Sequence, residues 1–278
     1  MLRNSKNLEG CAIGATDGSI GEVKDLYFDD EAWVIRYLVV GTGAWLENRK
    51  VLISPFALSQ PQWAQKLLRA SLTKEQVKNS PDIDTDMPVS RQHEMEYLKY
   101  YSYPSYWGGA ALWGIGPNPS LMPIGKAYEW PVDSYGQIRA EHDREVSNEH
   151  EKGDHHLRSC NAIRKYSIHA SDGDIGHVAG LLVDDETWAI RYLIVDTSNW
   201  GMGHQALVAP QWISNVSWPH SYVTIALSRG ELKDAPQYDG TSPVDRAQEI
   251  DLFKYYGRPG YWVPDEERDA GGRRGSNL

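Results

Sequence analysis

The chain has few of the features that support a disulfide scaffold, a zinc cluster or a membrane span. Its two cysteines, Cys11 and Cys160, show no CxxC spacing and no surrounding histidine cluster, so a structural zinc site is not expected. We interpret both as free thiols, although the sequence does not fix the distance between them. No apolar run approaches the ~18–20 residues that a membrane helix needs. The first residues lack the apolar stretch of a signal peptide, so a cytoplasmic protein is expected.

Positive charge is also scarce. The chain has 28 Lys and Arg against 38 Asp and Glu, a formal net charge of -10. Such a balance repels phosphate backbones, and direct nucleic-acid binding would need a local basic stripe. The densest basic runs, residues 139–144 and 273–274, are short or broken by acidic residues, and we interpret them as solvated surface charge.

Phenylalanine is rare among the aromatic residues. The chain has 3 Phe but 11 Trp and 16 Tyr, so most of its rings carry a polar group that needs a partner or water. Hydrophobic residues make up 41% of the chain and charged residues 24%, which is typical of a soluble globular protein with a sizeable core. The length of 278 residues predicts about two domains.

An internal repeat organises the chain. Residues 15–42 (ATDGSIGEVKDLYFDDEAWVIRYLVVGT) align without a gap with residues 170–197 (ASDGDIGHVAGLLVDDETWAIRYLIVDT), at an offset of 155. The match continues to KYYSYPSYW at 99–107 and KYYGRPGYW at 254–262. Roughly 40% of the aligned positions are identical, which predicts two copies of one module.

The repeat defines the expected domains. Residues 1–107 form a first module with a C-terminal helix, and residues 162–264 form a second module of the same kind. Residues 108–161 between them are first rich in Gly and Pro and then highly charged, so they are interpreted as a linker. Residues 265–278 are interpreted as a disordered tail.

Each module is expected to be mainly β with short helices. In the first copy, Asp17-Gly18 is a hairpin signal, and strands are expected over 20–28, 34–40, 50–54 and 67–72. Short strands at this spacing favour a small closed barrel. A short helix is expected at 72–77 and again at 227–232. A second helix should dock on the barrel through an apolar stripe, formed by Met95, Leu98 and Tyr101 in one copy and by Ile250, Phe253 and Tyr256 in the other.

The motif DGxIGxV…DDxxWxIRYLxV, followed by LISP in the first copy, resembles the PRC-barrel family. The resemblance implies two tandem PRC-type small β-barrels, close to stand-alone bacterial proteins with two copies. The family includes the cytoplasmic domain of the photosynthetic reaction centre H subunit and the C-terminal domain of the ribosome maturation factor RimM. It uses the barrel for assembly and docking. The membrane helix of the H subunit has no match here, and the first barrel occupies the place of RimM's RNA-facing domain.

The charged candidates have structural and functional interpretations. Arg36 and Arg191 lie mid-strand, where we expect an ion pair with a carboxylate of the neighbouring strand or of the helix, such as Glu94 or Glu249; the alternative is an anion site. The runs 29–31 and 184–186 are interpreted as solvated turns, with a Ca²⁺ or Mg²⁺ site as the alternative. A solvated linker is favoured over a transition-metal site for four histidines, namely His142, His150, His155 and His156.

The aromatic residues that end each module are the other candidates. Tyr106 and Trp107 close the first copy, and Tyr261 and Trp262 close the second. They are expected to pack over the barrel or on the sister module, and the alternative is that they anchor an interface, because such rings are enriched there. Together with Arg36 and Arg191, they are the candidate interaction residues.

No residue pattern predicts catalysis. The chain has no GxSxG, HExxH, GxxxxGK[ST] or GxGxxG motif, so we expect no enzyme, no catalytic residue, no metal and no cofactor. We expect a non-enzymatic interaction or assembly protein with a protein partner, and the duplication also allows a homodimer. The resemblance leaves two alternatives, an electron-transfer assembly role like that of the H subunit and a ribosome or RNA-processing adaptor role like that of RimM.

Overall fold

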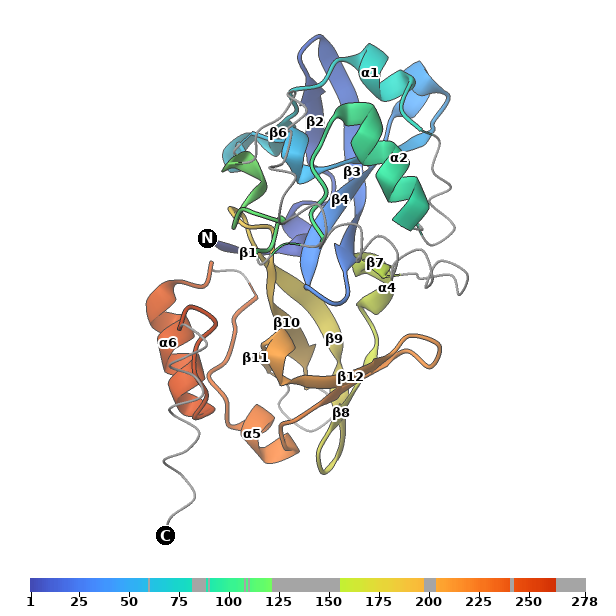
Figure 1. The fold of residues 1–278 in the computed structure, drawn as a ribbon. Helices are drawn as coiled ribbons and strands as arrows, with labels where there is room; N and C mark the ends of the chain where they lie inside the picture. The colour runs from blue at the N-terminus through green and yellow to red at the C-terminus, as the bar shows by residue number, and fades with distance from the viewer. Residues whose placement is uncertain are drawn as a thin grey trace, which may run out of the picture. The chain divides into compact units, whose positions relative to one another are not determined.

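A computed structural model describes residues 1–59, 61–81, 89, 91–107, 109, 111–121, 156–197, 204–240 and 243–263. The chain divides into two compact units. The larger unit consists of Asn4–Arg164 and Gly180–Arg191, and the smaller unit consists of Met1–Arg3, Lys165–Ala179 and Tyr192–Leu278. The expected mainly β fold with two separate sheets is confirmed (Figure 1).

The sheet of the larger unit has six strands in the order β5-β4-β3-β2-β6, and β7 pairs with β3 beside this path. All its neighbours are antiparallel except β2 and β6. After β5 the chain turns through Pro55–Ala57, and Leu58 then forms a bridge with Ala70 just beyond β6. The strands are β2 (Ala12–Ala15), β3 (Gly18–Asp29), β4 (Val34–Gly41), β5 (Lys50–Ile53), β6 (Leu67–Arg69) and β7 (Leu157–Ser159).

The core of this unit follows from the alternation in β3 and the continuous apolar run in β4. Val23, Leu26 and Phe28 of β3 are buried, and β4 is buried along almost its whole length. Gly21 lies on β3 with φ +156, where an added Cβ would lie 2.0 Å from the backbone oxygen of Gly41. Only glycine therefore allows β3 and β4 to approach so closely at this point.

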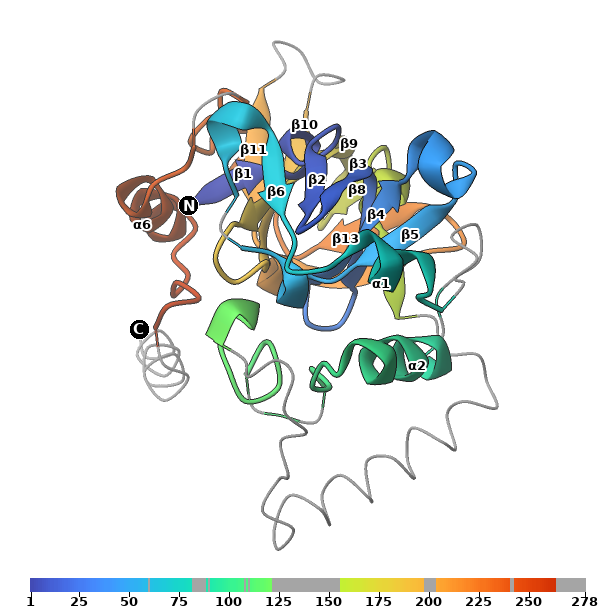
Figure 2. The same ribbon diagram turned by 90° about the horizontal axis from the view of Figure 1, so that it is seen from above.

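Two helices follow β6 in the larger unit. α1 (Lys74–Lys78) begins with a capping box of Thr73 and Gln76. α2 (Arg91–Tyr101) lies alongside the sheet (Figures 1 and 2). The buried Tyr97 hydroxyl fixes it there by donating to the Leu52 oxygen at 3.0 Å and accepting from the Ser54 amide at 3.1 Å.

The predicted stripe of α2 is partly wrong. Leu98 and Tyr101 are buried, but Met95 is 41% exposed, and the neighbouring Glu94 is fully buried in its place. In the other helix Ile250 is exposed and Glu249 is buried in the same way. Each glutamate has hydrogen-bond partners inside its unit, so burying it does not leave an unpaired charge.

The second sheet has seven strands, in the order β11-β10-β9-β8-β13-β12 with β1 (Leu2–Asn4) beside this path. The strands are β8 (Ser167–Ala170), β9 (Gly173–Asp184), β10 (Ile190–Asp196), β11 (Gln205–Val208), β12 (Ile213–Ser217) and β13 (Tyr222–Ile225). α5 (Arg229–Lys233) and α6 (Arg246–Tyr255) follow, each with a capping box. The box of α6 is formed by Asp245 and Gln248.

Part of the range predicted as a linker, 108–161, is structured. Trp113 is fully buried, Leu157–Ser159 forms β7, and Cys160 begins α4 (Cys160–Ile163), all in the larger unit. The Gly and Pro content of the first half of the range hid the segment of Trp113, and the charged second half hid β7 and α4. His142, His150, His155 and the tail 265–278 lie outside the described residues. Both cysteines are free and buried, and burial raises the pKa of both thiols.

Candidate functional site

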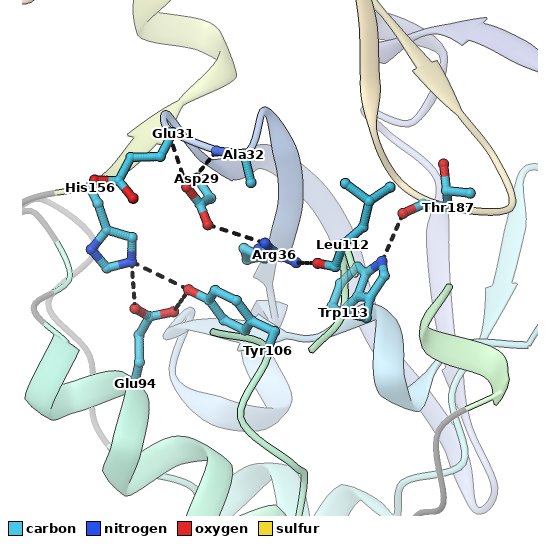
Figure 3. Close-up of polar contacts among 10 residues, drawn as sticks. All are labelled: Asp29, Glu31, Ala32, Arg36, Glu94, Tyr106, Leu112, Trp113, His156 and Thr187. Atoms are coloured by element: carbon cyan, nitrogen blue, oxygen red, sulfur yellow. Dashed lines mark hydrogen bonds and ion pairs between the residues drawn. The ribbon is translucent and has the colours of Figure 1, made fainter. Parts of the chain in front are cut away.

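A cluster of charged and aromatic side chains lies inside the larger unit (Figure 3). It brings together β3, β4, α2, the segment after α2 and the residue that precedes β7. Every polar residue that forms it is 6% exposed or less, which is rare for charged residues unless they are paired. The members are Asp29, Arg36, Glu94, Tyr106 and His156.

Asp29, the last residue of β3, is the counter-ion of Arg36. Its Oδ2 lies 3.1 Å from Arg36 Nη2, and its Oδ1 accepts from the amides of Glu31 and Ala32 at 3.1 Å each. Burial alone would raise the pKa of this carboxyl, but the Arg36 charge and the Ala32 amide outweigh burial and hold the pKa below its ordinary value. The prediction of a solvated turn is therefore wrong for Asp29, because this carboxylate is buried and neutralises the buried charge of Arg36.

Both terminal nitrogens of the Arg36 guanidinium have acceptors within the larger unit. Besides Asp29, its Nη1 donates to the Leu112 oxygen at 2.6 Å. Its guanidinium carbon lies 3.8 Å from the centre of the Tyr106 ring and 4.9 Å from that of Trp113. The expected ion pair with a neighbouring strand is confirmed. Since two rings, a carboxylate and a carbonyl surround Arg36, an external anion would have to displace one of them.

Glu94 connects the helix to two other segments. Tyr106 Oη donates to Glu94 Oε1, while His156 Nε2 lies 2.7 Å from Glu94 Oε2 and 3.3 Å from Tyr106 Oη. The sequence suggested Glu94 as a partner of Arg36, and it named His156 as part of a solvated linker. Both assignments are corrected, because Glu94 pairs with His156 and both are buried.

Trp113 links the cluster to another part of the larger unit. Its indole Nε1 donates to the Thr187 oxygen at 2.8 Å (Figure 3). Nearby, Ile190 N donates to Trp33 O at 2.7 Å and Ile35 N to Trp188 O at 2.8 Å. The segment Gly180–Arg191 is thereby held in this unit by backbone and side-chain hydrogen bonds.

The second copy repeats only part of the cluster. Arg191 Nη2 lies 3.5 Å from Asp184 Oδ2, and the two side chains are 18% and 17% exposed. In the smaller unit, Glu249 Oε1 accepts from two hydroxyls at 2.9 Å, those of Tyr192 and Tyr261. The position 155 residues before His156 is Met1, so the histidine has no counterpart in the repeat.

The aromatic candidates lie mostly against their own modules. Tyr106 is buried on Arg36 and Glu94, and Trp107 is half-buried. Tyr261 and Trp262 are also half-buried, and the Arg246 guanidinium carbon lies 4.3 Å from the Trp262 ring centre. Of the six candidates, the structure therefore brings Arg36 and Tyr106 directly together.

The sequence did not identify His156 as a member of the cluster or Trp113 as the residue that links it to Thr187. The comparison of the two copies could find Glu94 with Glu249 and Tyr106 with Tyr261, since both pairs are separated by 155. His156 and Trp113 each occur in one copy only, so that comparison gives no signal for them.

The cluster has the residue types of acid–base chemistry, but its geometry fits a structural crosslink. Each charge is met by an opposite charge or a hydrogen bond within the unit, and the five residues are 6% exposed or less, which leaves a substrate little surface to contact. Among the described residues, no group of three or more His, Cys, Asp or Glu could hold a metal ion. Within the same residues, no helix is long and apolar enough to cross a membrane.

The sheet of the larger unit defines a small mainly β domain with an interior Arg–Asp pair. The family model for the PRC-barrel domain matches residues 3–59, and the chain therefore contains a PRC-barrel domain there. This range includes β2 to β5 with Asp29 and Arg36, whereas Glu94, Tyr106 and His156 lie beyond it. No curated protein matches the chain.

Proposed function

We propose that this protein is a non-enzymatic assembly module with two PRC-type barrels in tandem, and that it acts by holding a protein partner. The observation that supports it most is a contrast in exposure. The clustered acid, base and phenol groups of the larger unit are buried, while apolar side chains at matching positions of α2 and α6 are exposed.

The tandem arrangement is supported by matching elements at one offset. β2, β3, β5 and α1 each begin 155 residues before β8, β9, β11 and α5, respectively. Gly176 in the second copy has φ +159 and the same close approach as Gly21, since an added Cβ would lie 1.9 Å from the Asp196 oxygen. Closure of the first barrel is supported by the bridge between Leu58 and Ala70.

The exposed apolar pairs suit a binding surface. Met95 and Tyr100 on α2 are 41% and 40% exposed, and their counterparts Ile250 and Tyr255 on α6 are 48% and 41% exposed. Tyr100 Oη donates to Gln76 O and Tyr255 Oη to Glu231 O, each at 2.9 Å. These bonds hold the rings in place before binding, which lowers the entropy lost on association.

Capture from native lysate tests the proposal. The variant carries Met95→Gln and Ile250→Gln. Both positions are exposed, and glutamine is a good helix former. The matched control carries Glu96→Gln and Asp251→Asn, the exposed neighbours on the same helices. We expect the control and the wild type to retain the same stoichiometric partner and the variant to lose it. Equal retention by all three proteins would overturn the apolar-surface role.

The captured partner also separates the narrower roles. An electron-transfer assembly role like that of the reaction centre H subunit predicts co-fractionation with a membrane complex. A RimM-like role predicts co-sedimentation with ribosomal particles at low salt. Both rest on fold resemblance, which does not carry function by itself. Substrate turnover by the purified protein would contradict the whole proposal.

A further inference from the structure

One edge of the larger unit is completed by a strand that comes from the second sequence copy. We call residues 156–161 the strap. They lie in the larger unit, whereas the rest of the second copy from Lys165 to Ala179 and from Tyr192 onward lies in the smaller unit. Within the strap, β7 pairs antiparallel with the end of β3, with Ser159 opposite Tyr27 and Leu157 opposite Asp29.

The strap is held by side chains as well as by the ladder. Arg158 Nε lies 2.7 Å from Asp30 Oδ2, and the two side chains are only 26% and 14% exposed. Ser159 Oγ donates to Asp25 Oδ2 at 2.5 Å, and the Asn161 amide donates to Asp25 Oδ1 at 3.1 Å.

The residues of the larger unit that contact the strap, which we call the seat, are complementary to it in charge. The seat presents Asp25, Asp30 and Glu94, and the strap presents His156 and Arg158 together with hydrogen-bond donors. Both Asp25 and Asp30 are half-buried, and burial raises the pKa of each carboxyl. An extended segment with this order of donors is what the seat recognises.

In the first copy, too, the leading strand lies in a different unit from the residues that follow it. β1 (Leu2–Asn4) and β7 (Leu157–Ser159) are separated by the repeat offset of 155. Residues Met1–Arg3 lie in the smaller unit, where Leu2 bridges Val244, although the first copy continues from Asn4 in the larger unit. In both copies, therefore, the leading strand is separated from its module, which is the arrangement that domain swapping produces.

We propose that the seat accepts the strap of a second copy of this chain, so that two chains exchange straps and form a dimer. This inference rests on the proposed function and names a partner for it. The 34 residues 122–155 precede the strap, and a chain of that length can reach up to about 110 Å. Each chain also carries its own strap, which competes for the seat, so exchange needs either a high protein concentration or a weakened strap.

Complementary charge reversals in full-length chains test the exchange. Asp30→Arg places Arg against Arg158, and Arg158→Glu places Glu against Asp30, so each single variant repels its own strap. A mixed dimer of the two variants has an opposite-charge pair at both seats. One chain carrying both changes restores the pair within the chain and serves as the control for folding. The two single variants are refolded alone and as an equimolar mixture, and their masses are measured by light scattering.

We expect the mixture to give a dimer containing both chains, at least about tenfold more abundant than in either variant alone. Monomers only in the mixture, with each variant folded, would overturn the proposal. If the single variants do not fold alone, recovery of a folded dimer in the mixture supports it, and failure of the mixture while the double variant folds overturns it. Met95 and Ile250 are unchanged in these chains, so capture of another protein by the double variant tests the proposed function separately.

Discussion

His156 Nε2 lies 2.7 Å from Glu94 Oε2 inside the larger unit, and this contact joins helix α2 to the residue that leads into β7. Tyr106 Oη bonds to the other oxygen of the same carboxylate. The pair thus holds two segments that are distant in sequence against the sheet. It is present in one copy of the repeat only, because Met1 occupies the matching position in the other.

Replacement of His156 should destabilise the larger unit. His156→Ala leaves Glu94 buried without its basic partner, and breaking a buried pair costs about 3–5 kcal/mol. Thermal and urea unfolding would measure the loss. The control Glu96→Ala, at an exposed position of α2, should change the free energy of unfolding by less than about 0.5 kcal/mol. Equal effects of the two changes would contradict a crosslink at Glu94.

Arg36 and Arg191 should differ in their tolerance of lysine. Arg36→Lys keeps the charge but loses the fork that reaches both Asp29 and Leu112 and stacks on Tyr106, so we expect a loss of about 2–3 kcal/mol. Arg191→Lys should cost about 1 kcal/mol or less, because its carboxylate lies at 3.5 Å and both groups are partly exposed. Denaturant unfolding of the two variants tests this order, and the reverse order would refute it.

Asp29 should make stability depend on pH in the acid range. Its folded pKa lies below the ordinary value, so its ionised form stabilises the fold at pH values above the unfolded pKa of about 3.9. That contribution is lost as the pH falls from there through the lower folded pKa. Unfolding of the wild type and of Asp29→Asn, measured between pH 7 and pH 2, should differ most at neutral pH and converge in acid. A constant difference over this range would count against the Arg36–Asp29 pair.

The sequence predicted well what local pattern and repetition determine. The alternation in β3 and the β-branched run of β4 specify strands, and the repeat identifies the same elements twice. The hairpin signal Asp17-Gly18 falls at the turn between β2 and β3, as the sequence predicts. Such features depend on neighbours within a few residues or on one tight turn.

The cluster could not be predicted in the same way. The burial of Glu94 and the exposure of Met95 depend on Tyr106 and His156, which reach α2 from other segments. An isolated helix pattern favours the apolar residue for the interior, and it carries no information about a distant hydroxyl or imidazole. Trp113 was hidden for the same reason, since its partner Thr187 lies in the other sequence copy.

The measurement that tests the central claim most directly compares binding with stability in the Met95→Gln and Ile250→Gln variant. Calorimetry with the captured partner should show at least about tenfold weaker binding, while the melting temperature stays within about 2 °C of the wild type. This result would place the function on the exposed helix surface and the stability in the buried cluster. Unchanged affinity in the folded variant would contradict the account.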